Sequence, residues 1–247
     1  MSLKIGLNLE RNYSINFDLP KRSKKLVKFI IIHYTGMKKQ INAIKRLCDS
    51  RTKVSTHYFI KNNGKVLKIV PDLYTAWHAG QSEWKNFKSL NKYSIGIEIN
   101  NPGHSYGYKN FSSNQIISLS ELLKYLIKKY NINKKNVLGH SDISPNRKKD
   151  PGEKFPWKKL ASKGLCLWHR LDEKKILKYR NKKLMHTEEK VFLNYLYKFG
   201  YSKLAKSRFK LKKKELIKSF QRRFRQSLVN GKIDQECFLI VKNIIKS

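Results

Sequence analysis

A short run of β-branched apolar residues is the feature that most limits what this chain can fold into. Residues 28–33 read KFIIIH, which predicts a buried strand. The run ends at His33, so an imidazole stands at the point where the strand leaves the core. A fold built around this strand therefore carries a polar side chain at one edge of its sheet.

Further apolar segments alternate between the period of strands and the spacing of helices. Helices are expected at residues 41–48 and 114–130, the second of them capped by Ser112 or Ser113. Strands interleaved with helices predict an α/β domain with a mixed central β-sheet flanked by helices. The other expected strands are residues 56–60 and 66–70, joined by an NNGK turn, residues 93–99, and residues 137–140.

The last third of the chain has a different composition. Residues 170–186 are highly charged and poor in large apolar side chains, which predicts a linker. Beyond it, helical segments are expected at residues 191–199, 212–225 and 235–245. The expected organisation is a domain at residues 16–169, a charged linker at 170–186 and a small all-α C-terminal domain at 187–247.

The chain is strongly basic. Lys and Arg number 55 against 17 Asp and Glu, a formal net charge of +38, which often indicates a polyanionic partner. However, Lys is dispersed and accompanied by many Asn, Ile and Tyr, as A/T-rich codons would give, and no zinc-finger or RNP-type motif is present. A nucleic-acid partner is therefore not expected. The three cysteines form no CxxC pair, which excludes a cysteine zinc knuckle.

Membrane and export signals are missing from the sequence pattern. No apolar run approaches the roughly 18 residues of a membrane helix. Residues 1–20 contain no apolar stretch of the kind that follows the basic start of a signal peptide. The expectation is a cytoplasmic monomer without a transmembrane segment, with the periplasm or cell envelope, reached by another route, as the alternative.

Polar residues at strand ends supply the candidate chemistry. His33, His140 and Asp150 would give zinc two imidazoles and one carboxylate, with one coordination position left open, as in catalytic sites. Structural histidines are the alternative. Glu98 lies in an isoleucine-rich strand, where a carboxylate is costly unless it is paired with a lysine or used as a base. Lys148, two residues before Asp150, could stabilise an oxyanion or be an ordinary surface lysine.

Six short segments together resemble a known family. In order they are residues 32–36 (IHYTG), 55–60 (STHYFI), 76–80 (AWHAG), 94–99 (SIGIEI), 138–142 (LGHSD) and 147–152 (RKKDPG). This order resembles that of the zinc-dependent N-acetylmuramoyl-L-alanine amidases of the second amidase family, which are related to the peptidoglycan recognition proteins. The resemblance covers about residues 16–168 and identifies residues 16–169 as a zinc amidase domain.

The resemblance implies a role for each candidate residue. His33, His140 and Asp150 would bind Zn2+, Glu98 would activate the attacking water, and Lys148 would hold the oxyanion. The reaction would be hydrolysis of the amide between the lactyl group of N-acetylmuramic acid and L-alanine. Three further residues match positions that line the substrate groove in this family, namely His57, Trp77 and His78.

Two departures from the phage lysozyme members narrow the resemblance. Thr56 stands where those members have a catalytic tyrosine, and Asp150 stands where they have a cysteine. Both differences point to the branch of the family that uses a glutamate as base.

The C-terminal segment resembles the helical peptidoglycan-binding module through residues 220–224 (FQRRF) and 229–234 (VNGKID). The usual Gly/Asp-rich loop is replaced by the basic residues 203–214, so glycan binding and a plain three-helix prop both remain open. The expected ligand is peptidoglycan or its muropeptide fragments, in polymeric or in soluble anhydro form. A catalytically inactive peptidoglycan-recognition protein is the alternative, although the three ligand positions and Glu98 argue against it.

Overall fold

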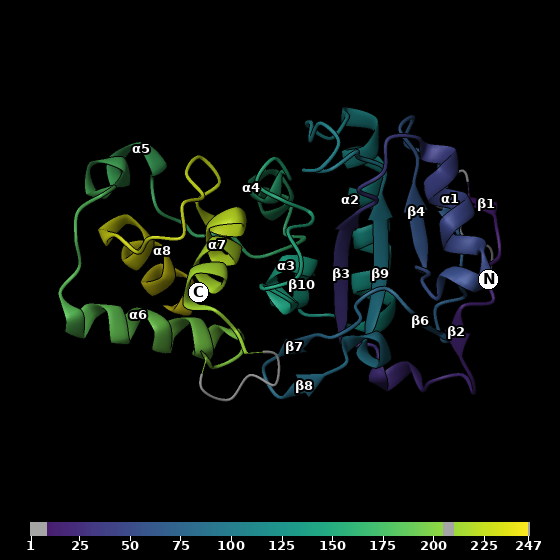
Figure 1. Ribbon diagram of the computed structural model, residues 1–247, viewed down its shortest axis with the longest axis horizontal. Coiled ribbons are helices and arrows are strands. Elements are labelled where there is room, and N and C mark those ends of the chain that lie inside the picture. The colour runs from purple at the N-terminus through teal and green to yellow at the C-terminus, as the bar shows by residue number, and fades with distance from the viewer. Residues whose placement is uncertain (1–8, 205–209, 247) are drawn as a thin grey trace.

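The computed structural model describes residues 9–204 and 210–246 (Figure 1). Residues 1–8, residues 205–209 of the basic segment 203–214 and residue 247 lie outside the described residues. The structure has a mixed central β-sheet flanked by helices, with further helices at the C-terminal end, so the predicted fold class is confirmed.

The central sheet has six strands in the order β1-β5-β4-β9-β3-β10. Strands β4, β9, β3 and β10 run parallel to one another, whereas β5 is antiparallel to β4 in the predicted hairpin. The bounds are β1 Leu9–Arg11, β3 Phe29–Tyr34, β4 Tyr58–Ile60, β5 Val66–Lys68, β9 Ser94–Ile99 and β10 Val137–Gly139. Four short strands lie outside this sheet, namely β2 Phe17–Asp18, β6 Thr75–Ala76, β7 Glu83–Trp84 and β8 Phe87–Lys88.

Helix α2, Ser113–Tyr130, covers one face of the sheet. Its apolar side chains pack against that face, which includes Ile95, Ile97 and Ile99 of β9. Ser112 caps the helix as predicted: its hydroxyl accepts a hydrogen bond from the Gln115 amide, and the Gln115 side chain accepts one from the Ser112 amide. The reciprocal bonds satisfy two amides that a helix start leaves free, which fixes where α2 begins.

The opposite face is covered in two places. Helix α1, Gln40–Cys48, packs with Ala43 and Leu47 near Phe59 of β4. At the β10 edge, Phe29 and Ile31 share a buried cluster with the C-terminal helices. The stretch of sheet between these two covers is where polar strand-end side chains are left facing a pocket.

The C-terminal helices pack directly on the β10 edge (Figure 1). They are α6 His186–Phe199, α7 Lys213–Phe224 and α8 Gln235–Lys246, close to the predicted segments. The remaining helices are α3 His140–Ile143, α4 Trp157–Ser162 and α5 Glu173–Ile176, with 3₁₀ helices at Lys24–Leu26, Ser50–Thr52, Leu90–Tyr93, Lys134–Asn136 and Leu177–Tyr179. Two of these lie inside residues 170–186, so that segment contains helical turns; its role as a linker, and the domain boundaries, stay predictions. None of the described helices is long and apolar enough to cross a membrane.

Candidate active site

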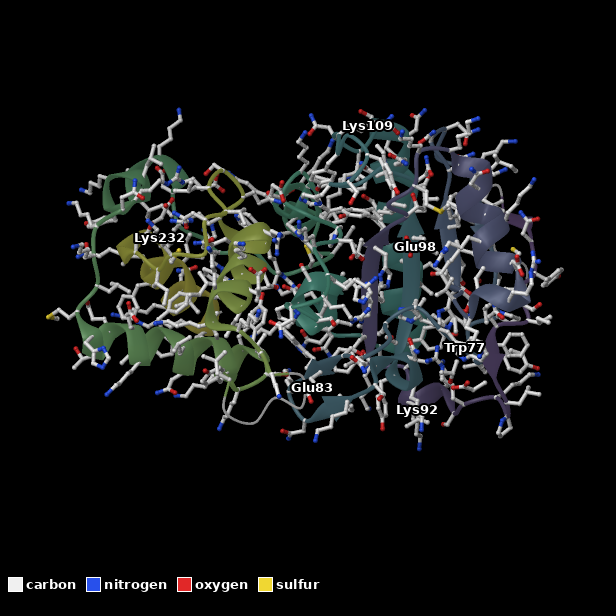
Figure 2. All side chains as sticks on the ribbon, viewed as in Figure 1. Trp77, Glu83, Lys92, Glu98, Lys109 and Lys232 are labelled. Carbon is white, nitrogen blue, oxygen red and sulfur yellow. The ribbon has the colours of Figure 1, made fainter. Side chains whose placement is uncertain are left out.

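Three adjacent parallel strands place the candidate residues side by side. The pairing of β3 with β9 sets His33 directly opposite Glu98, and the pairing of β3 with β10 sets Gly139 opposite Ile32, so His140 follows beside His33. Side chains alternate along a strand, and Ile32 and Ile97 pack on the face covered by α2. His33 and Glu98 therefore point to the opposite face, and Figure 2 shows Glu98 on β9, where it directly precedes the last residue of the strand.

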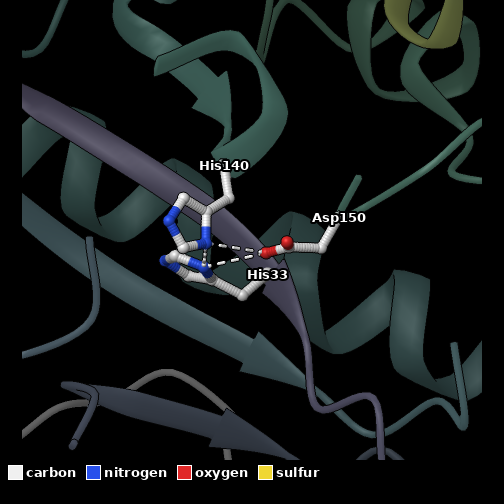
Figure 3. A group of neighbouring side chains, drawn as sticks. All are labelled: His33, His140 and Asp150. Carbon is white, nitrogen blue, oxygen red and sulfur yellow. Dashed lines mark hydrogen bonds and ion pairs between the residues drawn. The ribbon is translucent and has the colours of Figure 1, made fainter. Parts of the chain in front are cut away.

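His33, His140 and Asp150 form a tight buried cluster (Figure 3). The Nδ1 atoms of the two histidines are 2.9 Å apart, and each lies 3.0 Å from Oδ2 of Asp150. All three side chains are at least nine-tenths buried. Two ring nitrogens and one carboxylate oxygen thus converge on one point.

A chain of hydrogen bonds determines which nitrogen of His33 carries the proton. The Leu90 carbonyl can only accept a proton, and it lies 2.6 Å from the Ser94 hydroxyl, which must donate to it. The Ser94 oxygen then accepts from Nε2 of His78 at 3.2 Å, and Nδ1 of His78 accepts from Nε2 of His33 at 3.0 Å. His33 Nδ1 is left with a lone pair directed toward His140 and Asp150.

His140 is oriented by a simpler contact of the same kind. Its Nε2 lies 3.1 Å from the carbonyl of Ala79, which can only accept, and 3.4 Å from Nη2 of Arg147, which can only donate; the shorter contact favours the proton on Nε2. Its Nδ1 therefore also presents a lone pair to the cluster. Outer hydrogen bonds that fix the tautomer in this way are typical of metal-binding histidines.

Charge in the cluster also favours a cation. Burial, together with the neighbouring His140, lowers the pKa of His33 to about 4, so this imidazole is neutral near pH 7. Asp150 supplies the carboxylate of the cluster, and its Oδ2 atom faces the Nδ1 atoms of both histidines. Two imidazoles and one carboxylate fit a divalent metal with an open position, because their donor atoms lie 2.9–3.0 Å apart, close to the roughly 3.3 Å between neighbouring ligand atoms of a tetrahedral zinc site.

The cluster of His33, His140 and Asp150 borders a pocket of about 410 Å³. Glu98 and Lys148 line it together with His140 and Asp150. The Oε2 atom of Glu98 is buried and has no hydrogen-bond partner among the described residues. Burial and the negative charge of Asp150 raise the pKa of Glu98 to about 8, with Lys148 opposing them. A carboxylate in this condition is suited to take up a proton near neutral pH.

The three residues predicted to line the substrate groove are placed differently from one another. Trp77 and His78 line the pocket, and the Trp77 indole donates to Asp18 at 2.7 Å. His57, in contrast, is fully buried and is not among the described residues that line the pocket. Its ring contacts Arg22 and the Tyr74 carbonyl, each at 3.0 Å, and a substrate contact for His57 stays a prediction.

Other pocket residues were not predicted from the sequence. The Tyr34 hydroxyl lies 2.8 Å from Nδ1 of His104, whose Nε2 lies 3.1 Å from the Glu153 carboxylate. Tyr34 and His104 both line the pocket. The position of Tyr34 directly after His33 was the one available signal. Arg46, Arg147 and Lys149 also line the pocket and give it a basic wall.

Comparisons with known proteins agree on one family. The family model described as N-acetylmuramoyl-L-alanine amidase matches residues 22–153. The N-acetylmuramoyl-L-alanine amidase AmiD of Escherichia coli (strain K12) is 35% identical over 234 residues, which are 89% of this chain and 83% of that protein. The 1,6-anhydro-N-acetylmuramyl-L-alanine amidase AmpD of Haemophilus influenzae is 38% identical over 111 residues, 44% of this chain and 58% of that protein.

A solved structure extends the similarity over both parts of the chain. It is the complex of AmiD from E. coli with anhydro-N-acetylmuramic acid-L-Ala-D-gamma-Glu-L-Lys. That structure matches with a TM-score of 0.77 and 31% identity, covering 93% of this chain and 92% of its own.

Proposed function

This chain belongs to the family of N-acetylmuramoyl-L-alanine amidases, and we propose that it hydrolyses the amide bond between N-acetylmuramic acid and L-alanine in peptidoglycan fragments. The observation that carries this proposal is the geometry of the pocket. Two histidines with inward lone pairs and one carboxylate meet there beside an unpaired buried glutamate. The enzyme class follows from the family, and the roles below are assigned from the position of each side chain.

We assign Zn2+ to His33, His140 and Asp150. The nitrogen and oxygen donors, their burial and the fixed tautomers support this metal over the harder cations, which prefer oxygen ligands alone. When bound, zinc lowers the pKa of a coordinated water and polarises a carbonyl oxygen.

Glu98 is assigned as the general base and then the general acid. Its carboxylate takes a proton from the water that attacks the lactyl carbonyl carbon, and a tetrahedral intermediate forms. The same proton is then delivered to the nitrogen of L-alanine as the C–N bond breaks, so proton and electron pair leave together with the amine. The raised pKa of Glu98, about 8, suits a group that must both accept and return a proton.

Lys148 is assigned to the oxyanion. It lies on the pocket wall near Glu98 and Asp150, where its ammonium group can stabilise negative charge on the attacked carbonyl oxygen. Trp77 and His78 are assigned to the substrate side of the pocket, and His78 also orients His33.

Soluble anhydro-muropeptides are the substrate class that we favour. The names of the AmpD relatives and the ligand of the AmiD complex both contain an anhydro-muramoyl group. The pocket wall formed by Arg46, Arg147 and Lys149 offers positive charge to the carboxylates of a stem peptide. Cytoplasmic action, with the envelope as the alternative, and a monomeric state without a nucleic-acid partner stay predictions.

Product analysis tests the proposal. The protein with stoichiometric zinc is incubated with anhydro-muropeptides, with reduced muropeptides and with intact sacculi, and the products are identified by mass spectrometry. We expect free stem peptides with an N-terminal L-alanine, released fastest from the anhydro form, and none with Glu98→Gln. Binding of muropeptides without cleavage by the zinc-loaded protein would instead support an inactive recognition protein.

A further inference from the structure

A short helix, α3, links the C-terminal helices to the cluster of His33, His140 and Asp150. His140 is the first residue of α3, a helix of only four residues that is completely buried. A single helical turn is not stable by itself, so the position of α3 depends on its contacts with the surrounding residues. The Ser141 amide, in the same turn, donates to the Asp150 carbonyl at 2.8 Å. Displacement of α3 would therefore disturb two of the three metal ligands.

Asp142, two residues after His140, is the main anchor of this turn. Its Oδ2 accepts from the Gly139 amide at 2.8 Å and from Nη1 of Arg223 at 2.6 Å. Its Oδ1 accepts from the Tyr201 hydroxyl at 2.6 Å. The Asp142 side chain has no exposed surface. Two of its three donors thus come from residues that follow the predicted linker.

Arg223, in the last turn of α7, donates hydrogen bonds to one residue before His140 in the chain and to one residue after it. Besides Asp142, it donates through Nη2 to the carbonyl of Val137 in β10 at 3.0 Å. Its guanidinium stacks on Trp157, 4.6 Å from the ring centre, and it is 1% exposed. One turn earlier on α7, the Ser219 hydroxyl donates to the Ser141 carbonyl at 2.7 Å.

We propose that Arg223 is a positioning residue for the metal site, which it supports by fixing α3 and hence His140 through Asp142. The inference rests on the proposed metal role of His140. Without Arg223, the Asp142 carboxylate is left buried with an uncompensated charge, and α3 must shift to bring it water or another donor. The C-terminal helices therefore act as part of the metal site's supporting shell, whether or not they also bind glycan.

Arg225 provides a matched control. It lies two residues further along the chain, is equally buried, and pairs with Asp234 and Glu236 inside the C-terminal part. Removal of either arginine breaks a buried ion pair, so both changes should destabilise the protein. Only Arg223 is bonded to the segment that carries His140.

The test measures zinc affinity in the full-length protein by competition with a chelator. We expect Arg223→Met to weaken zinc binding about tenfold or more and to alter the visible spectrum of the cobalt-substituted protein, whereas Arg225→Met leaves both unchanged. If Arg223→Met does not fold, Tyr201→Phe and Ser219→Ala each remove one hydrogen bond to α3 and should weaken zinc binding more than Arg225→Met does.

Two results would overturn the inference: equal zinc affinity in the Arg223→Met and unsubstituted proteins, or equal weakening by Arg223→Met and Arg225→Met. The result is separable from the proposed function. An active, zinc-binding protein whose affinity ignores Arg223 refutes only the positioning role. A protein that binds no zinc refutes the metal assignment, and the inference falls with it.

Discussion

Replacement of Glu98 by glutamine should stabilise the metal-free protein at high pH while it abolishes activity. The pKa of Glu98 is raised from 4.5 to about 8, because the carboxylate is buried and lies near Asp150. Its neutral form is therefore favoured by folding. This contribution is fully present below about pH 4.5, and it is lost as the pH rises through about 8.

The size of the effect follows from that difference. About 3.5 pH units correspond to roughly 5 kcal/mol at pH 9, which is an upper bound. Although Oε2 of Glu98 is buried, the residue as a whole is partly exposed where it borders the pocket, so solvent reduces the penalty, and we expect about 2 kcal/mol. Glutamine has the same shape and cannot ionise, so the free energy of unfolding of the variant does not fall in this way at high pH. The two proteins should be equally stable at pH 4.

Urea unfolding of the chelated proteins, followed by tryptophan fluorescence at pH 4, 7 and 9, measures the difference. The zinc-loaded variant should lose at least about 10²- to 10⁴-fold in kcat, so that no product is detected. Glu153→Gln is the matched control. Although burial favours its neutral form, the hydrogen bond with His104 lowers the pKa of Glu153, so this variant should gain no stability at pH 9. A stability difference for Glu98→Gln that does not change with pH would refute the reasoning.

Three further results are expected. Lys148→Met should lower kcat about 10²- to 10³-fold in steady-state assays with a smaller change in KM, because the oxyanion loses its cation; a change in KM alone would contradict the assignment. Asp72→Asn should destabilise the protein by about 2–4 kcal/mol at pH 7, because it leaves Lys68 and Lys129 without their buried partner. Burial opposes ionisation of Asp72, but the two lysines hold its pKa well below the usual range; the difference in urea unfolding should therefore shrink below about pH 4, and a constant difference would argue against the ion pairs. Finally, kcat/KM for anionic muropeptides should fall as ionic strength rises while kcat stays constant. The reason is that the net charge is +38 and that lysines such as Lys92, Lys109 and Lys232 lie far apart over the molecule (Figure 2). A kcat/KM that does not change with ionic strength would exclude electrostatic steering of the substrate.

Local patterns in the sequence predicted much of the fold. The apolar run before His33 marked a strand exit, and the alternation around Glu98 placed that carboxylate on the face opposite the isoleucines. Ser112 or Ser113 was predicted to cap α2, and Ser112 does so, because a helix cap is a contact between near neighbours. The short strands β2, β6, β7 and β8 have two residues each, too few to show a period.

Contacts between distant segments were beyond local patterns. The Tyr34–His104 hydrogen bond joins residues 70 positions apart, and the Arg223–Asp142 pair joins residues 81 positions apart. Neither pair has a spacing that sequence periodicity can reveal. The contacts of His57 are a further example, since its ring lies against Arg22, 35 positions away, and the Tyr74 carbonyl, 17 positions away.

Dependence of amidase activity on bound zinc tests the central claim most directly. The metal-free protein is titrated with zinc, and bound metal and release of L-alanyl stem peptide from anhydro-muropeptide are measured on the same samples. The account predicts that activity rises in proportion to bound zinc up to one ion per chain, and that Asp150→Ala loses both. Full activity in protein free of zinc, or cleavage at a different bond, would contradict it.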